Sequence, residues 1–259
     1  MNEAVAANEI VETSYRTGLV VLSYGIAVLG SFVALTAAQR IRGRRGISWL
    51  NLVAAGTALG GIGVWSMHFT GMLALNLGMG SGYSMVETLI SLLAAIAATS
   101  LALAFVARRP DSTGRLLGAG VLLGLGVAFM HYLGMYGMRF PGYIVWSVPV
   151  VALSVFIAVA AASAALWLSF RTSSPGLRAV AAAVMGAAVC SMHYTGMAAA
   201  DFVCVSEAQR FARPQGFAVI SALDLPVFTV IVAIGLAALI GVDQLIQQRD
   251  QMRQTLRGG

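Results

Sequence analysis

Charge is scarce in this chain of 259 residues, and one charged residue type is missing altogether. Only 10% of the residues are charged, whereas a soluble globular domain carries about 25%, and the sequence contains no lysine. Together with 59% hydrophobic residues, this composition excludes a water-soluble enzyme, a disordered regulator and a coiled coil. The two cysteines, Cys190 and Cys204, are too few for a disulfide framework, and the sequence leaves open whether they pair.

Long apolar runs without a central charge occur seven times in the sequence. Each is long enough to cross a bilayer, for which about 20 residues suffice. We therefore predict an all-α integral membrane protein with seven transmembrane helices. The predicted spans are 17–39, 50–75, 86–107, 116–138, 144–169, 179–200 and 222–242.

The arginines predict how the spans are oriented. Twelve of the sixteen follow the first, third, fifth or seventh span, and four lie at the opposite ends. By the positive-inside rule, the N-terminus lies outside and the C-terminus in the cytoplasm. In a membrane protein this excess, which gives a net charge of +6, sets topology and contacts lipid headgroups, so we do not expect nucleic-acid binding.

A short motif repeats three times with a spacing of 63 and then 62 residues. Its copies are Met67-His68-Phe69-Thr70, Met130-His131-Tyr132-Leu133 and Met192-His193-Tyr194-Thr195, each followed by Gly-Met. Each repeat is thus a pair of helices with the motif on the even-numbered helix, and the seventh span is left over. Because the even-numbered spans run outward, the three motifs should meet near the outer leaflet.

The motif contains every histidine of the chain and half of its twelve methionines. Residues four apart share a helix face, so each histidine points the same way as the methionine four positions later. The candidate metal ligands are His68, His131 and His193 with Met72, Met135 and Met197, and then Met67, Met130 and Met192. Imidazole with thioether is a soft ligand set that favours copper. Zinc on three histidines and haem with histidine axial ligands are the alternatives.

Other residues near the motifs have plainer interpretations. Phe69, Tyr132 and Tyr194 are expected to pack rather than to bind a metal. Cys190 lies one turn before His193 but has no counterpart in the other repeats, so we expect a passive thiol. Glu87 and Asp224 are expected to be solvated carboxylates at helix starts, with hydrogen bonding to a histidine as the alternative.

Met192-His193-Tyr194-Thr195 spells the signature of the MHYT membrane sensor domains, and the other two copies differ from it at one position each. The chain resembles this family from about residue 15 to 243. The resemblance implies a bacterial inner-membrane domain of seven spans that binds copper through the histidines and methionines and senses a diatomic gas such as O₂, CO or NO. It also implies a cytoplasmic output partner, such as a cyclic-di-GMP synthase, a cyclic-di-GMP phosphodiesterase or a histidine kinase.

These inferences divide the chain into a periplasmic segment 1–16, an MHYT sensor domain 17–242 and a cytoplasmic linker 243–259 that begins a signalling helix. No catalytic or nucleotide-binding segment is recognisable, so we do not expect an enzyme. Leu245, Met252 and Leu256 are spaced for a short seam with a second chain, which makes a homodimer one expected assembly. The alternatives are a copper transporter or channel, and a membrane hydrolase with zinc on three histidines.

Overall fold

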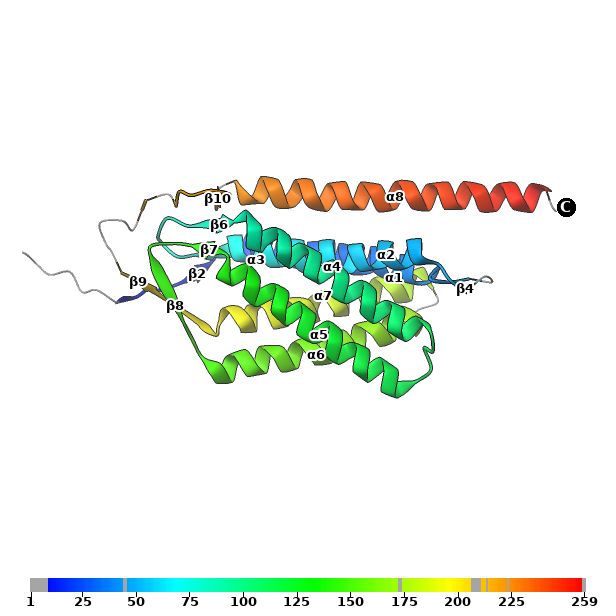
Figure 1. Ribbon diagram of the computed structural model, residues 1–259, viewed down its shortest axis with the longest axis horizontal. Helices are drawn as coiled ribbons and strands as arrows, with labels where there is room; N and C mark the ends of the chain where they lie inside the picture. Colours follow the sequence, from blue (N-terminus) through cyan, green and yellow to red (C-terminus); the bar gives the residue numbers. More distant parts are fainter. Residues whose placement is uncertain are drawn as a thin grey trace, which may run out of the picture.

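The computed structural model describes residues 9–43, 46–171, 174–205, 211–212, 214–222 and 224–257. Its helices lie side by side in one elongated bundle (Figure 1). They are α1 (Thr17–Ala38), α2 (Trp49–Gly56), η1 (Thr57–Ser66), α3 (Met67–Ala74), α4 (Met85–Ala107), α5 (Thr113–Tyr136), α6 (Val148–Arg171), α7 (Pro175–Met197) and α8 (Leu225–Arg257).

The observed helices match the seven predicted spans. α2, η1 and α3 follow one another without a break and form the second span, so six spans are long and apolar enough to cross a membrane. The seventh span lies within α8, whose apolar stretch is the shorter Val227–Val242. The chain is therefore a multi-pass, all-α membrane protein, as the hydropathy predicts.

Serine side chains cap the three motif-bearing spans at their arginine-rich ends. Ser48, Ser112 and Ser174 each accept a hydrogen bond from the backbone N–H three residues later. This bond satisfies one of the amide groups that a helix leaves unpaired in its first turn. The third of these helices begins with Pro175, whose fixed backbone angle suits the first helical position.

Six spans close into a ring in sequence order. Each span packs against the next, and α7 returns to pack against α1. The motif-bearing helices also contact one another, so they form an inner triangle within the ring. α8 stands outside the ring and packs mainly against η1 and α3, which makes the second span the most enclosed of the six.

The second span contains a ten-residue π-helix, η1, directly before the first motif. The Ser66 hydroxyl donates to the carbonyl of Gly61, five residues earlier, in keeping with the wider turn. A Cβ at Gly60 would overlap the backbone of Ala95 on α4. Backbones therefore approach closely here, as small residues permit in membrane bundles. The sequence analysis did not predict this π-helix.

Short antiparallel strands gather at the end of the bundle that holds the motifs (Figure 1). One sheet joins β1 (Glu9–Ile10), β9 (Ala200–Cys204) and β8 (Gly142–Trp146), and another joins β10 (Val219–Ser221), β6 (Gly82–Ser84) and β7 (Met138–Arg139). A third pairs β2 (Ser14–Tyr15) with β5 (Leu75–Asn76). At the arginine-rich end, β3 (Arg42–Gly43) and β4 (Gly46–Ile47) are the one strand pair among the described residues. The hydropathy gives no sign of these strands.

α8 is one unbroken helix of 33 residues, and its last turns extend beyond the other helices at the arginine-rich end (Figure 1). The seventh span therefore continues as helix into the segment 243–257, where the sequence predicts the beginning of a signalling helix. The side chains of Leu245, Met252 and Leu256 lie outside the described part of the structure, as do residues 1–8 of the N-terminal segment. The predicted seam therefore stays a prediction.

Candidate metal centre

The three motif histidines meet at the centre of the inner triangle. Their Nδ1 atoms lie 3.1 Å apart for His68 and His193, 3.1 Å for His68 and His131, and 3.3 Å for His131 and His193. The rings are nearly perpendicular to one another, with centroids 4.9–5.1 Å apart. Each histidine is 1% exposed. The convergence predicted from topology is therefore observed.

A glycine of the neighbouring repeat provides the space for each imidazole. A Cβ at Gly134 would overlap Nε2 of His68, one at Gly196 would overlap Nε2 of His131, and one at Gly71 would overlap Nε2 of His193. The contacts run in a closed cycle, since each ring lies over the glycine of the next repeat. The missing side chain of each motif glycine thus leaves the space that a histidine ring occupies.

The residue after each histidine packs edge-on against that histidine. Phe69, Tyr132 and Tyr194 place their ring centroids 4.7, 4.8 and 4.8 Å from the neighbouring imidazole. This supports the interpretation of these aromatic residues as packing residues.

The two tyrosines also bond to serines on the adjacent odd-numbered spans. Tyr132 pairs with Ser154 on α6, and Tyr194 pairs with Ser23 on α1. Each serine hydroxyl donates to the carbonyl three residues earlier, so the tyrosine donates to the serine.

The first repeat makes the equivalent contact differently. Phe69 has no hydroxyl, and the indole Nε1 of Trp65 donates instead to Ser91 on α4, at 3.0 Å. Ser91 in turn donates to the carbonyl of Thr88, as its counterparts do to theirs. The sequence does not single out the three serines, because a lone serine in an apolar helix resembles any other small packing residue.

Three imidazole Nδ1 atoms at these distances cannot all be paired with one another in hydrogen bonds. A ring nitrogen either carries a proton and donates, or lacks one and accepts. Among three such nitrogens, at least two must be of the same kind, and that pair cannot form a hydrogen bond. A cation that accepts a lone pair from all three nitrogens removes this conflict. The donor set is therefore suited to holding a metal ion.

The spacing of the nitrogens fits a small metal ion. Three nitrogens bound tetrahedrally at about 2.0–2.1 Å are separated by roughly 3.3–3.4 Å, and the observed separations are 3.1–3.3 Å. His68, His131 and His193 form a buried group able to hold a metal ion.

The surroundings of the triangle carry no negative charge. Within the described ranges, no Asp, Glu or Cys joins the three histidines. Glu87 instead pairs with Arg139 at 2.8 Å and accepts from the Ser84 hydroxyl, and Asp224 is exposed. The Nε2 atoms have no hydrogen-bond partner, so a histidine–carboxylate pair, the alternative considered for Glu87 and Asp224, is not formed.

The six motif methionines are all buried, each with at most 2% exposure. Met72 lines a cavity at the outer end of the bundle, whereas Met192 lines an apolar pocket among α5, α6 and α7. Met67, Met130, Met135 and Met197 lie in the bundle core. Their role as ligands stays a prediction. No disulfide joins Cys190 and Cys204 in the described structure.

Fold and site together define a membrane protein of three two-helix repeats around a buried three-histidine centre. Residues 4–54, 61–119, 124–182 and 186–259 match MHYT, described as "Bacterial signalling protein N terminal repeat". The chain therefore belongs to the MHYT family, as its motif indicates. The last three matches begin at Gly61, Gly124 and Gly186, each seven residues before the motif histidine, which agrees with the observed repeat.

Curated relatives are signalling proteins much longer than this chain. The bifunctional diguanylate cyclase/cyclic di-GMP phosphodiesterase MucR of Pseudomonas aeruginosa is 42% identical over 73% of this chain and 28% of its own length. The cyclic di-GMP phosphodiesterase NbdA of the same species is 33% identical over 72% and 24%. The signaling protein YkoW of Bacillus subtilis is 32% identical over 74% and 25%.

The chain spans about a quarter of the length of these relatives. No solved structure matches it.

Proposed function

We propose that this chain is a copper-dependent sensor domain of the bacterial inner membrane. Cu(I) is held by the Nδ1 atoms of His68, His131 and His193 near the outer end of the bundle. Binding of a diatomic gas, or a change in metal or redox status, is the stimulus, and a cytoplasmic output domain is the recipient. The observation that carries the proposal is the triangle of Nδ1 atoms in surroundings without an anionic group.

The absence of a nearby carboxylate favours a monovalent ion over a divalent one. Three neutral histidines leave Cu(I) with one net charge and Zn²⁺ with two. The cost of burying an ion rises with the square of its charge, so the divalent ion costs roughly fourfold more in the same cavity. Buried methionines in every motif add soft ligands within the same helices.

The alternative of a zinc hydrolase lacks a general base. Of the acids considered near the outer end, Glu87 is held by Arg139, and Asp201 and Asp224 are exposed. Glu207 lies outside the described residues. A water activated on zinc needs an acid or base within hydrogen-bond reach, and none of these described acids joins the histidine cluster.

A route from the metal centre to the cytoplasm runs through α8. Trp65, three residues before His68, makes an edge-on contact with Phe228 at 6.2 Å between ring centroids. Gly61 in the π-helix faces Leu236 on α8, since a Cβ at Gly61 would lie 2.8 Å from the Cδ1 atom of Leu236. A displacement of the first motif helix therefore acts on α8. The output partner we propose is a cyclic-di-GMP synthase or phosphodiesterase, because MucR and NbdA carry those activities in their names.

Metal analysis of the purified chain tests the proposal. His68→Ala, His131→Ala and His193→Ala should each reduce bound copper severely, because each removes one of three ligands. Met72→Leu, Met135→Leu and Met197→Leu should weaken Cu(I) more than Zn²⁺ if the thioethers bind. Met185→Leu, equally buried but outside the motifs, is the matched control. Full copper occupancy in the triple histidine variant would overturn the proposal.

Gas binding has its own readout. Carbon monoxide added to the copper-loaded, reduced protein should give an infrared C–O stretch that disappears in His131→Ala. A protein that holds copper and shows no such band would retain the metal site but lose gas sensing, leaving metal or redox status as the stimulus.

A further inference from the structure

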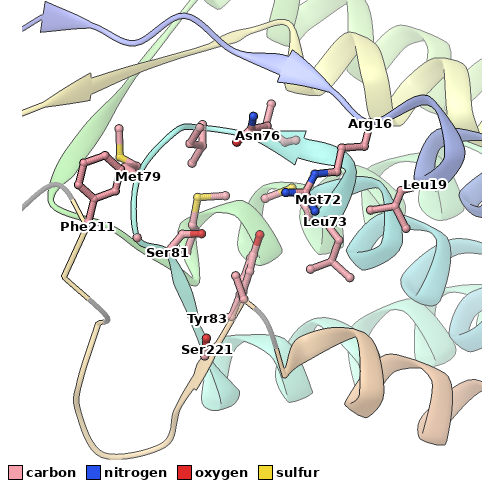
Figure 2. A pocket seen from close by; sticks show the side chains of 15 residues that line it. Arg16, Leu19, Met72, Leu73, Asn76, Met79, Ser81, Tyr83, Phe211 and Ser221 are labelled. Carbon is pink, nitrogen blue, oxygen red and sulfur yellow. The ribbon is translucent and has the colours of Figure 1, made fainter.

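A second site lies above the metal centre. A cavity of about 390 Å³ opens at the outer end of the bundle, between α1, the end of α3, β6 and the segment around Phe211 and Ser221. Figure 2 shows side chains from these elements directed around one space. A cavity of this size falls within the range of small-molecule sites, roughly 300–1,000 Å³.

Tyr83 on β6 directs its hydroxyl into this cavity. The side chain is 2% exposed, its ring packs edge-on against Phe69 at 5.8 Å, and its hydroxyl points into the space (Figure 2). Within the described part of the chain the hydroxyl has no hydrogen-bond partner. Burial raises the pKa of Tyr83, so the hydroxyl stays protonated as a donor. The hydroxyl is therefore available to donate a hydrogen bond to a ligand oxygen in the cavity.

Arg16 brings a positive charge to the same cavity. Its backbone N–H donates to the carbonyl of Ala74, which fixes the residue above the end of α3. Its side chain extends toward Met72 (Figure 2) and forms no ion pair among the described residues. No carboxylate is found among the described residues that line the cavity, so this charge is available to an anion. Asn76 adds an amide on the same wall.

The other side chains that line the cavity are mostly apolar, and three of them are flexible methionines. They include Leu19, Met72, Met79 and Met138. Apolar side chains and thioethers close to a charged group suit a molecule with an anionic head and an apolar body. Asn76 on β5 and Phe211, which precedes β10, complete the lining at the motif end of the bundle.

We propose that this cavity binds a small organic carboxylate, with its oxygens on Arg16 and Tyr83 and its apolar part against Met72, Met79 and Met138. Met72 lies four residues after His68 on α3, so an occupant contacts the helix that carries a motif histidine. The domain then has an effector site as well as the metal centre. This inference does not depend on metal binding.

Binding can be measured on the full chain in maltoside micelles with ¹³C-methyl-labelled methionine. Benzoate is the probe, and benzamide is the control because it has the same shape without the charge. Benzoate should shift the methyl signals of Met72, Met79 and Met138, each assigned by its Leu variant. Met192, which lines a separate pocket, should not move.

Two variants identify the groups responsible. Arg16→Gln should weaken benzoate binding at least about tenfold, because it removes a charge-assisted hydrogen bond, and Tyr83→Phe should weaken it by about threefold to tenfold. Arg115→Gln, at the opposite end of the bundle, should leave it unchanged. Equal binding of benzamide, unchanged affinity in Arg16→Gln, or no shift of the three methyl signals would overturn the proposal. Loss of copper binding in the histidine variants would not affect it.

Discussion

Adding one methyl group at a motif glycine should disable the metal centre without altering any ligand. In Gly134→Ala the new Cβ would overlap Nε2 of His68 and lie 3.1 and 3.3 Å from two of its ring carbons. Helix backbone holds the Cβ in place, so the imidazole must retreat. Displacement by about 1 Å restores an ordinary contact, whereas metal ligands tolerate only about 0.2 Å.

The ring of His68 has little freedom to retreat and keep its geometry. It is in contact with Phe69 at 4.7 Å and with the other two imidazoles at 4.9 and 5.0 Å between centroids. Overpacking a site of this kind costs about 1–3 kcal/mol, which a membrane bundle survives. The Nδ1 atom, however, leaves the triangle. We expect copper affinity to fall about 10- to 100-fold, equivalent to roughly 1.4–2.8 kcal/mol.

An anaerobic competition titration against a chromophoric Cu(I) chelator measures this loss, with a thermal melt of each variant to verify folding. Gly71→Ala and Gly196→Ala should behave like Gly134→Ala, since the three contacts are equivalent. Gly118→Ala is the control on the same helix, because its Cβ would meet nothing closer than a phenyl carbon at 3.9 Å. A folded Gly134→Ala protein that binds Cu(I) within twofold of wild type, while His68→Ala does not, would refute the seating of the ring over the glycine.

Three further outcomes are expected. In a fusion to a reporter output domain, Gly61→Val should abolish the stimulus response but retain copper binding, because the new side chain would displace Leu236 of α8. Gly235→Val is the control and should retain the response, because the space around Gly235 is open. Inserting two residues after Gln248 turns the end of α8 by about 200° and should change the response, and inserting seven should largely retain it; equal responses would identify a flexible tether. A maleimide that cannot cross membranes should label Phe217→Cys from outside, since Phe217 lies at the motif end and is 99% exposed. The same reagent should label Asp111→Cys only from the cytoplasmic side. The reverse pattern would contradict the predicted orientation.

Hydropathy and spacing alone determined the membrane architecture. A bilayer accepts few solutions other than apolar helices of about 20 residues, so the composition fixed the spans to within a few residues. The repeat of 63 and 62 residues then placed the three motifs on alternate helices at one depth. From these facts the meeting of His68, His131 and His193 followed without any knowledge of how the helices pack.

The tertiary structure decided which atoms meet and what surrounds them. Sequence periodicity assigns a residue to a helix face, but the rotation of each helix and its neighbours depend on packing between distant segments. Only the fold shows that Nδ1 rather than Nε2 faces the centre, that Gly134 seats the ring of His68, and that Ser154 receives the hydroxyl of Tyr132.

The short sheets at the motif end and the π-helix could not be predicted from the sequence either, because both arise from long-range contacts. Two-residue strands such as β2 and β5 pair only because the helices bring their loops together, and no local pattern marks them. The cavity holding Arg16 and Tyr83 forms between such loops. The membrane spans can thus be predicted from the sequence, because a bilayer requires long apolar helices. The chemistry of both sites depends on contacts between distant segments, which only the packed bundle creates.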